Sequence, residues 1–383
     1  MNWNWQQPDW PDFSWNKARF VKAEALFLVE AGEFAGMVKH LGREDHDLIT
    51  VEAMSTEAVT TSEIEGEILN RDSVQSSIRR QLGLSSDRRR AGPAEQSIAE
   101  VMVDLYHNFA EPLSADTLFN WHRLLMSGRS DINDPGRYRT HAEAMQVVSG
   151  AIYAPKIHFE APPSADVPGE MSRFVDWFQR TAPGGSEPLP ALARAAIAHL
   201  YFVCIHPFED GNGRIGRAIA EKALAQTIGR PTLAALAATI LARRKGYYDA
   251  LEANNKFNEI TDWIAWFAAT VIEAQRRSIA SVDFLIDKTR LLDRVNPVIN
   301  ERQRKALLRM LQEGPEGFKG GLTAGKYTSI TGASPATATR DLADLVAKDA
   351  LVRAGERRHA YYALTIPLHY VAPVVIGRTG DVE

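Results

Sequence analysis

The sequence predicts a mainly α-helical protein with a small β-hairpin and a C-terminal winged helix-turn-helix. Three observations support this fold class. Apolar residues recur with helical spacing through most of residues 16–289. Short β-type segments replace that pattern between residues 138 and 163. After Asn296, helical segments are followed by two more β-type segments.

The composition is that of an ordinary soluble, folded chain. Of 383 residues, 45% are hydrophobic and 24% are charged, which excludes overall disorder and suggests two to three domains of roughly 150 residues. The single cysteine, Cys204, excludes an intrachain disulfide and a cysteine-based zinc cluster. We find no signal peptide and no apolar run of the roughly 18 residues that cross a bilayer. We therefore expect a cytoplasmic protein without membrane contact. The net charge of −4 limits any nucleic-acid binding to a local surface.

The first fifteen residues predict an aromatic arm that lies across the folded body. They contain four of the eight tryptophans, and Pro8 and Pro11 prevent a helix. So much aromatic surface is unfavourable in water. A packing strap is the simpler interpretation, and a contact in a homodimer is the alternative.

Helical periodicity follows the arm. Phe20, Phe27, Phe34 and Leu41 recur every seven residues and lie on one helical face. A second helix, residues 48–65, ends at Gly66, a residue type that caps helices. Further helices are predicted at residues 72–82, 94–107, 114–127, 168–180, 191–205, 215–228, 247–255 and 261–289.

Two segments interrupt or follow the helices. A hairpin is predicted from residues 146–150 and 157–159, which glycine and proline bound. In residues 296–364, a helix at 301–311, a glycine-rich stretch and a helix at 323–330 precede a third helix with Ser334 as its N-cap. The β-type segments after it complete the order typical of a winged helix.

Basic residues outnumber acidic residues by four in residues 296–364. Such an excess suits contact with phosphates, through Thr337, Thr339 and Arg340 on the expected recognition helix and Arg357 and Arg358 on the wing. DNA binding is one interpretation of this segment. Binding of a protein, or a dimer contact, is the other.

The segment with the clearest chemistry is residues 206–217, His-Pro-Phe-Glu-Asp-Gly-Asn-Gly-Arg-Ile-Gly-Arg. Pro207 ends a buried helix, and a Gly-Asn-Gly turn leads into a new helix near Arg214. Backbone N–H groups at a helix start attract anions, and the helix dipole adds to this. The sequence therefore predicts an anion site at this turn.

The side chains around the turn add three further functions. Arg214 and Arg217 are neighbours on the new helix and can hold several phosphate groups. Asp210 is a hard oxygen ligand for the Mg²⁺ that accompanies a nucleotide. His206 can accept a proton near neutral pH, because the ordinary pKa of histidine is about 6.5.

The same twelve residues resemble the signature of the Fic family, HPFxDGNGRxxR, and match its nine fixed positions. The likeness covers most of residues 1–290. It implies a Fic-type helical bundle that transfers AMP from ATP to a Ser, Thr or Tyr hydroxyl of a target protein. His206 would deprotonate the hydroxyl and Asp210 would bind Mg²⁺. The residues that would bind ATP are Gly211, Asn212, Gly213, Arg214, Ile215, Gly216 and Arg217.

Other activities stay open. A branch of the family that transfers phosphate has Lys where this chain has Gly213, so the glycine favours nucleotidyl transfer. Transfer or removal of another phosphate-containing group is an alternative. A further alternative is a DNA-binding regulator whose Fic core senses ATP, although a sensor does not need His206.

Residues 61–66, Thr-Ser-Glu-Ile-Glu-Gly, resemble the inhibitory motif of the family, [S/T]xxxE[G/N]. A carboxylate in the last turn of a helix is unfavourable by roughly 0.3–1 kcal/mol unless a cation faces it. The resemblance implies that Glu65 pairs with Arg217 and inhibits the enzyme in cis.

The hairpin resembles the flap with which the family binds its target by strand addition, a mode based on backbone hydrogen bonds. The residues that would contact the target are Val147, Val148, Ser149 and Gly150. The target is another protein or a second copy of this chain. A purely structural hairpin is the alternative.

The nucleoside pocket is less well defined by the sequence. Tyr247, Tyr248, Asn254 and Asn255 lie where relatives contact adenine and ribose, and which member of each pair does so stays open. The expected domains are residues 1–95 with the arm and inhibitory helix, 96–290 with the catalytic core, and 296–370 with the winged helix.

Overall fold

The structure, a computed structural model, describes residues 2–84, 91–151, 154–356 and 360–383. Its contacts divide the chain into two compact units, Met1–Gln275 with Pro373–Glu383, and Arg276–Ala372. Each unit has a hydrophobic core of its own. Arg357 and Arg358, expected on the wing, lie outside the described residues.

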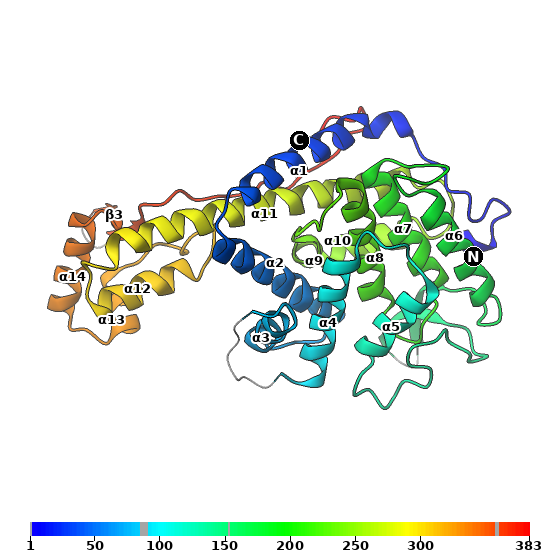
Figure 1. Cartoon of the computed structure of the whole chain (residues 1–383), viewed down its shortest axis with the longest axis horizontal. Coiled ribbons are helices and arrows are strands. Elements are labelled where there is room, and N and C mark those ends of the chain that lie inside the picture. The colour runs from blue at the N-terminus through cyan, green and yellow to red at the C-terminus, as the bar shows by residue number, and fades with distance from the viewer. Residues whose placement is uncertain (1, 85–90, 152–153, 357–359) are drawn as a thin grey trace. The chain divides into compact units, whose positions relative to one another are not determined.

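The predicted mainly helical class is confirmed (Figure 1). The first unit also contains an antiparallel hairpin, β1 (Gln146–Ala151) and β2 (Ala154–Glu160). Its helices are α1 (Val21–Lys39), α2 (Arg43–Ile64), α3 (Arg71–Gln81), α4 (Pro93–Asn108), α5 (Ala115–Leu125), α6 (Val167–Arg180), α7 (Ala191–Ile205), α8 (Asn212–Ile228), α9 (Leu236–Ala242), α10 (Arg244–Ala253) and the first part of α11 (Thr261–Val295).

Helix α7 forms the centre of the first unit. Fourteen of its fifteen residues are buried, as expected for a helix that is apolar on every side. It packs closely against α8, where a Cβ added to Gly216 would meet His199 and Val203 at 3.1 Å. This close packing fixes the loop between the two helices, residues 206–211.

The aromatic arm packs on the body of the same unit. Trp10 lies edge-on to Tyr201 of α7, with ring centroids 5.1 Å apart. Trp3 lies edge-on to Phe159 of β2, and the Trp5 indole donates a hydrogen bond of 2.7 Å to the Glu160 carbonyl. The arm therefore acts as a strap and holds the base of the hairpin, while a homodimer contact stays a prediction.

Three features differ from the sequence-based expectation. Helix α8 begins at Asn212, because Gly211 has a left-handed φ of 80° and lets the helix start directly after it. Helix α11 continues to Val295. The short helix α9 was not predicted. A residue from a distant helix caps its start: the Ala237 N–H donates to both carboxylate oxygens of Glu57 at 2.9 Å.

The second unit contains the rest of α11, three helices and an antiparallel strand pair. Leu322 extends the pair, exchanging backbone hydrogen bonds of 2.8 and 2.9 Å with Tyr362. This is the element order that the sequence predicts, while the winged-helix assignment and its DNA or protein partner stay predictions. The elements are α12 (Glu301–Leu311), α13 (Ala324–Thr331), α14 (Pro335–Ala347), β3 (Leu351–Ala354) and β4 (Tyr361–Leu364). Within the described part of the chain, no helix is long and apolar enough to span a membrane.

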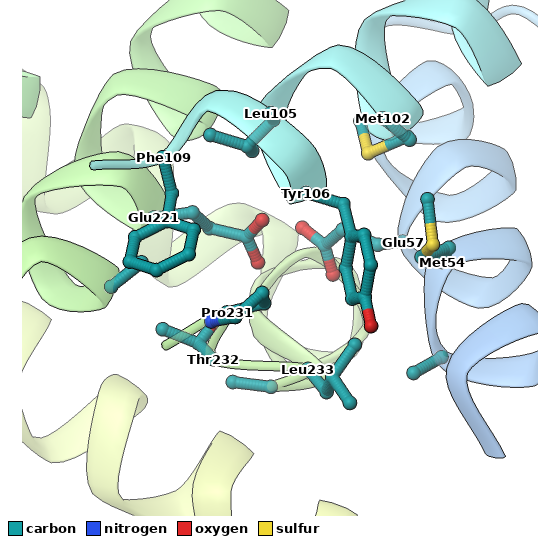
Figure 2. A pocket seen from close by; sticks show the side chains of 13 residues that line it. Met54, Glu57, Met102, Leu105, Tyr106, Phe109, Glu221, Pro231, Thr232 and Leu233 are labelled. Carbon is teal, nitrogen blue, oxygen red and sulfur yellow. The ribbon is translucent and has the colours of Figure 1, made fainter. Parts of the chain in front are cut away.

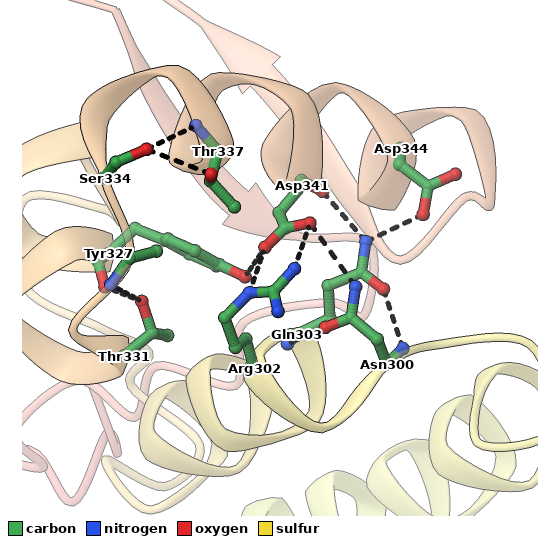
Figure 3. A network of polar contacts seen from close by, with 10 residues as sticks. Asn300, Arg302, Gln303, Tyr327, Thr331, Ser334, Thr337, Asp341 and Asp344 are labelled. Carbon is green, nitrogen blue, oxygen red and sulfur yellow. Dashed lines mark hydrogen bonds and ion pairs between the residues drawn. The ribbon is translucent and has the colours of Figure 1, made fainter.

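The buried carboxylate of Asp341 links the helices of the second unit (Figure 3). It accepts hydrogen bonds from the Tyr327 hydroxyl of α13 at 2.9 Å and from Arg302 Nε of α12 at 3.0 Å. Burial would raise the pKa of Asp341, but the bonds from Arg302, Tyr327 and Asn300 outweigh burial and lower it. Asp341 thus stabilises the unit in its charged form.

We expect Asp341→Asn to loosen the second unit, because it replaces a charged acceptor by an amide that cannot serve all these donors. A buried donor without a partner costs about 1–3 kcal/mol. Hydrogen exchange measured by mass spectrometry on the full chain should become faster in α12 and α14. Asp349→Asn is the matched control, since the Asp349 side chain is 74% exposed. Equal exchange rates in the two variants would contradict this role of Asp341.

Candidate active site

The position of His206 is set by strained backbone at the end of α7. Its φ is 51°, a left-handed value that residues other than glycine rarely adopt. Buried Arg139 holds this conformation: its Nε donates to the His206 carbonyl at 2.8 Å and its backbone N–H to the Pro207 carbonyl at 3.0 Å. Arg139 Nη1 also donates to Ser164 Oγ at 2.8 Å, which ties the loop to the segment after the hairpin.

The His206 ring is arranged to act as a base. Its Nδ1 lies 3.3 Å from the Val203 carbonyl, which assigns the hydrogen to Nδ1 and leaves Nε2 as an acceptor. Burial lowers the pKa of His206 to about 4, although the Val203 carbonyl acts in the opposite direction. The imidazole is therefore neutral at pH 7, because this pH lies well above its pKa.

The loop after His206 is closed by a pair of hydrogen bonds. Asn212 donates from its side chain to the Phe208 carbonyl at 2.8 Å and accepts from the Phe208 N–H at 3.0 Å. Phe208 is fully buried and stacks on His122, with centroids 4.1 Å apart. Because its side chain closes the loop, Asn212 offers a ligand its backbone N–H. The first N–H groups of a helix have no acceptor within the helix, so the start of α8 is free to bind an anion.

Arg217 of α8 is bound to the end of α2. Its Nη2 lies 2.8 Å from Glu65 Oε1 and donates to the Thr61 carbonyl at 2.9 Å, while its Nε donates to Thr61 Oγ1 at 2.7 Å. The exposed fraction of the side chain is 1% for Arg217 and 28% for Glu65. The geometry thus contains the pair of residues that the sequence placed together.

Glu65 also lies directly against the start of α8. A Cβ on Gly213 would overlap the Glu65 carboxylate, so a larger residue at that position would force the Glu65 side chain to move. The neighbouring Glu67 forms a second ion pair, 2.7 Å from Arg214 Nη1. The end of α2 therefore places two carboxylates where the triphosphate of a nucleotide would lie.

Both arginines keep a buried donor for a ligand. Arg217 Nη1 and Arg214 Nε are buried and have no hydrogen-bond partner among the described residues. Buried donors without partners are rare in folded proteins, since each one costs free energy. An anion such as phosphate, bound at the start of α8, would supply the missing acceptors.

A cavity of about 560 Å³ adjoins these residues. The hairpin strands β1 and β2 and the helices α7 and α10 form its walls. Of the predicted site residues, those that line it are Glu65, Val147, Val148, Ser149, His206, Gly213, Tyr247, Tyr248 and Asn255. Ile215 and Gly216 pack instead in the core between α7 and α8, so they could serve a nucleotide only through their backbone.

The residues expected around the nucleoside differ in position. Tyr247 is buried, and its hydroxyl lies 2.8 Å from His199 Nε2. Tyr248 is 39% exposed at the cavity wall. Asn255 donates to the His158 carbonyl at 3.0 Å, whereas the Asn254 side chain turns back to its own helix and bonds the Ala250 carbonyl.

The hairpin is anchored to α10 beside this cavity. Ser149 Oγ lies 2.6 Å from His158 Nε2, and His158 Nδ1 lies 2.7 Å from Glu252 of α10. Val147 and Val148 are 37% and 50% exposed on β1. Among the described residues β1 pairs with β2 in a two-stranded sheet, which leaves its other edge for an incoming peptide.

Asp210 fits a Mg²⁺ ion that arrives with a nucleotide. Its side chain is 40% exposed, and one oxygen pairs with Arg129 Nη1 at 3.0 Å. Among the described residues, no three His, Cys, Asp or Glu side chains form a metal cluster. One carboxylate is enough when phosphates and water supply the other ligands.

Sequence reasoning missed three residues of this site. Arg139 lies in the segment 135–139, which resembles Fic proteins, but nothing in the sequence indicates that it holds the His206 carbonyl. Glu67 follows the inhibitory motif directly, and its charge next to that motif was an available signal. Arg129 gave no signal, since its pairing with Asp210 depends on the fold.

Comparison with known families and proteins agrees with this geometry. The model of the Fic/DOC family matches residues 112–224, and a domain of unknown function, DUF4172, matches residues 3–84. A uridine 5'-monophosphate transferase of Xanthomonas campestris pv. campestris is 27% identical over 149 residues, covering 37% of this chain and 26% of that protein. The protein adenylyltransferase fic-1 of Caenorhabditis elegans is 33% identical over 108 residues, covering 28% of this chain and 18% of that protein. The chain thus spans about a quarter or less of the length of these relatives.

Solved structures show the same fold. A Fic family protein from Desulfovibrio desulfuricans G20 aligns with a TM-score of 0.50 at 20% identity, covering 90% of this chain and 97% of that one. A Fic-domain signalling protein from Bacteroides thetaiotaomicron aligns with a TM-score of 0.51 at 18% identity, covering 68% of this chain and 96% of the other. Together with the HPFxDGNGRxxR motif, the family match shows that this chain contains a Fic/DOC-family domain at residues 112–224.

Proposed function

We propose that the first unit transfers AMP from ATP to a hydroxyl group of a protein target and that the end of α2 inhibits this transfer. One observation carries the proposal: a neutral imidazole, an open helix start and two arginines with unpaired buried donors gather beside one cavity. Relatives named protein adenylyltransferases, at about 30% identity, support it at the level of the family.

The chemistry requires positioning and neutralisation of charge more than it requires reactive groups. The target hydroxyl gives its proton to His206 Nε2 while its oxygen forms a bond to the α-phosphorus of ATP. The bond from this phosphorus to the bridging oxygen breaks, and pyrophosphate leaves. Arg214 and Arg217 would neutralise the departing phosphates. A Mg²⁺ ion held by Asp210 would add positive charge to the same phosphates.

The hairpin would bring the target to this centre. A peptide that pairs with the exposed edge of β1 is held by its backbone, so many sequences can bind. Such a strand would lie along the same cavity as His206. The acceptor of the AMP group would therefore be a hydroxyl in an extended, accessible segment of the target. This segment can belong to another copy of the chain.

The transferred nucleotide has one alternative that a comparison favours. The relative from Xanthomonas campestris is named a uridine 5'-monophosphate transferase. Both reactions would use the same phosphate contacts, and they differ only in the base that the cavity accepts near Tyr248 and Asn255. The mass added to the modified protein distinguishes UMP from AMP.

Inhibition would follow from competition for charge. Glu65 binds the guanidinium that the phosphates need, and Glu67 binds the second one. Arg217 is almost fully buried, so it needs a partner in every state, because an unpaired buried charge costs several kcal/mol. ATP would have to displace Glu65 before it could adopt the reactive position.

We expect Glu65→Gly to raise transfer of label from α-labelled ATP by about tenfold or more, which corresponds to removing a competing contact of about 1.4 kcal/mol. Mass spectrometry should show the added mass of AMP. His206→Ala in the same background should abolish the label. Glu63→Gly, two residues earlier on α2, is the matched control. A Glu65→Gly chain no more active than the wild type would exclude the inhibitory role.

Glu67→Gln should activate more weakly. The Glu67 side chain is 39% exposed, and an ion pair that is partly exposed contributes about 1 kcal/mol or less. Initial transfer rates should therefore rise by about fivefold at most. The result that counts against a role for Glu67 is an unchanged rate together with unchanged ATP affinity.

The pH profile of the Glu65→Gly chain tests the state of His206. A base must be neutral, and burial places the pKa of His206 at about 4, so protonation should abolish transfer only well below pH 6. Glu65 raises that pKa, so its removal shifts the pKa further down. We expect kcat/KM to be level between pH 6 and 8. A loss of activity centred near pH 6.5 would show an ordinary histidine instead.

A further inference from the structure

A second, smaller cavity lies beside the inhibitory helix (Figure 2). It has a volume of about 40 Å³, is open to solvent on one side, and is bounded by α2, α4, α8 and residues 231–234. Glu57 of α2 and Glu221 of α8 point their carboxylates toward one another in it. Their residues are only 5% and 9% exposed.

The two glutamates differ in their contacts. Both oxygens of Glu57 accept from the Ala237 N–H at 2.9 Å, which leaves lone pairs free on the cavity side. Glu221 has no hydrogen-bond or ion-pair partner among the described residues. Arg217, whose charge acts on Glu57, is already bound to Thr61 and Glu65. Two buried carboxylates thus face each other without a cation of their own.

This arrangement is unfavourable unless something neutralises it, because buried charges need partners. One solution is protonation, since burial raises the pKa of Glu57 to about 7, and burial together with Glu57 raises that of Glu221. The other solution is a bound cation. The walls of the cavity decide which cation would fit.

The walls are largely apolar. Met54, Met102, Leu105 and Phe109 surround the carboxylates, and Tyr106 lies beside Glu57. Mg²⁺ and Ca²⁺ need six or more oxygen ligands, which such walls cannot provide. An alkyl ammonium ion matches both parts of the cavity: its N–H groups bind carboxylates, its methylene groups contact apolar walls, and aromatic rings attract its charge. The enclosed volume of about 40 Å³ has room for an ammonium group, and the open side of the cavity leaves room for a short alkyl chain.

We propose that this cavity, here called the amine cavity, binds a small aliphatic amine as its ammonium ion between Glu57 and Glu221. Amines of this class are protonated at pH 7, as the side chain of lysine is. A diamine would match the charge of both glutamates.

Binding there would strengthen inhibition, a consequence that rests on the proposed function. Glu57, Thr61 and Glu65 follow one another at intervals of four residues on α2, as Gly213, Arg217 and Glu221 do on α8. A cation between Glu57 and Glu221 would join the two helices about two turns from Glu65 on α2 and about one turn from Arg217 on α8. Bound amine should therefore hold α2 in the inhibiting position.

Calorimetric titration of the full chain tests the binding itself, without any need for activity. The probes are 1,4-diaminobutane and 1-aminobutane, with 1-butanol as the uncharged analogue and MgCl₂ and CaCl₂ as metal salts. We expect saturable binding of the amines alone and a rise in melting temperature when they bind. Glu221→Gln should weaken binding at least tenfold, and Glu33→Gln, at an exposed position on α1, should not change it.

Tyr106→Leu serves as a second variant if Glu221→Gln fails to fold, as judged by circular dichroism; it should weaken amine binding by a smaller factor. Binding of the metal salts in place of the amines would overturn the proposal. So would the absence of any binding, with a more stable Glu221→Gln chain, since this result identifies a carboxyl pair that shares a proton.

The effect on transfer is measured separately. Diaminobutane should lower AMP transfer by the wild-type chain and leave the Glu65→Gly chain unaffected. Binding without a change in wild-type transfer would overturn the regulatory consequence. A Glu65→Gly chain that transfers nothing would overturn the proposed function. The calorimetric result would still show whether the amine cavity binds an amine.

Discussion

The buried guanidinium of Arg217 is the constraint on which the candidate active site depends. Its side chain is 1% exposed, so its charge must have a partner at all times. Thr61 and Glu65 provide that partner in this structure. The unpaired Nη1 shows that these contacts do not use every donor. A phosphate group could therefore bind Arg217 before the Glu65 carboxylate leaves, so a bound nucleotide could displace Glu65 and relieve the inhibition.

Helices α2 and α8 run antiparallel along their contact, and three successive pairs of residues meet across it. Glu57 faces Glu221, Thr61 binds Arg217, and Glu65 lies against Gly213. The spacing of four residues keeps each set on one face of its helix. The anion site and the amine cavity thus lie along the same two helices, about two helical turns apart.

The sequence predicted the local features and missed the contacts that depend on the fold. The HPFxDGNGRxxR segment and the hairpin could be predicted because each is encoded within a short stretch of residues. The Glu65–Arg217 pair, which spans 152 positions, could be predicted only because both residues lie in motifs that resemble those of one family. Helix α9 was missed since its cap, Glu57, comes from a distant helix. The same holds for Arg139, whose bond to the His206 carbonyl crosses 67 positions of the chain. The pKa of His206 depends on burial, which no sequence pattern gives.

The most direct test of the account is a crystal structure of the Glu65→Gly chain with Mg²⁺ and a non-reactive ATP analogue. The account predicts that the triphosphate lies at the start of α8 and accepts hydrogen bonds from Arg214 and Arg217. It also predicts His206 Nε2 on the side of the α-phosphorus opposite the bridging oxygen. A triphosphate bound elsewhere, or an Arg217 that keeps all its contacts to Thr61 and ignores the nucleotide, would contradict it.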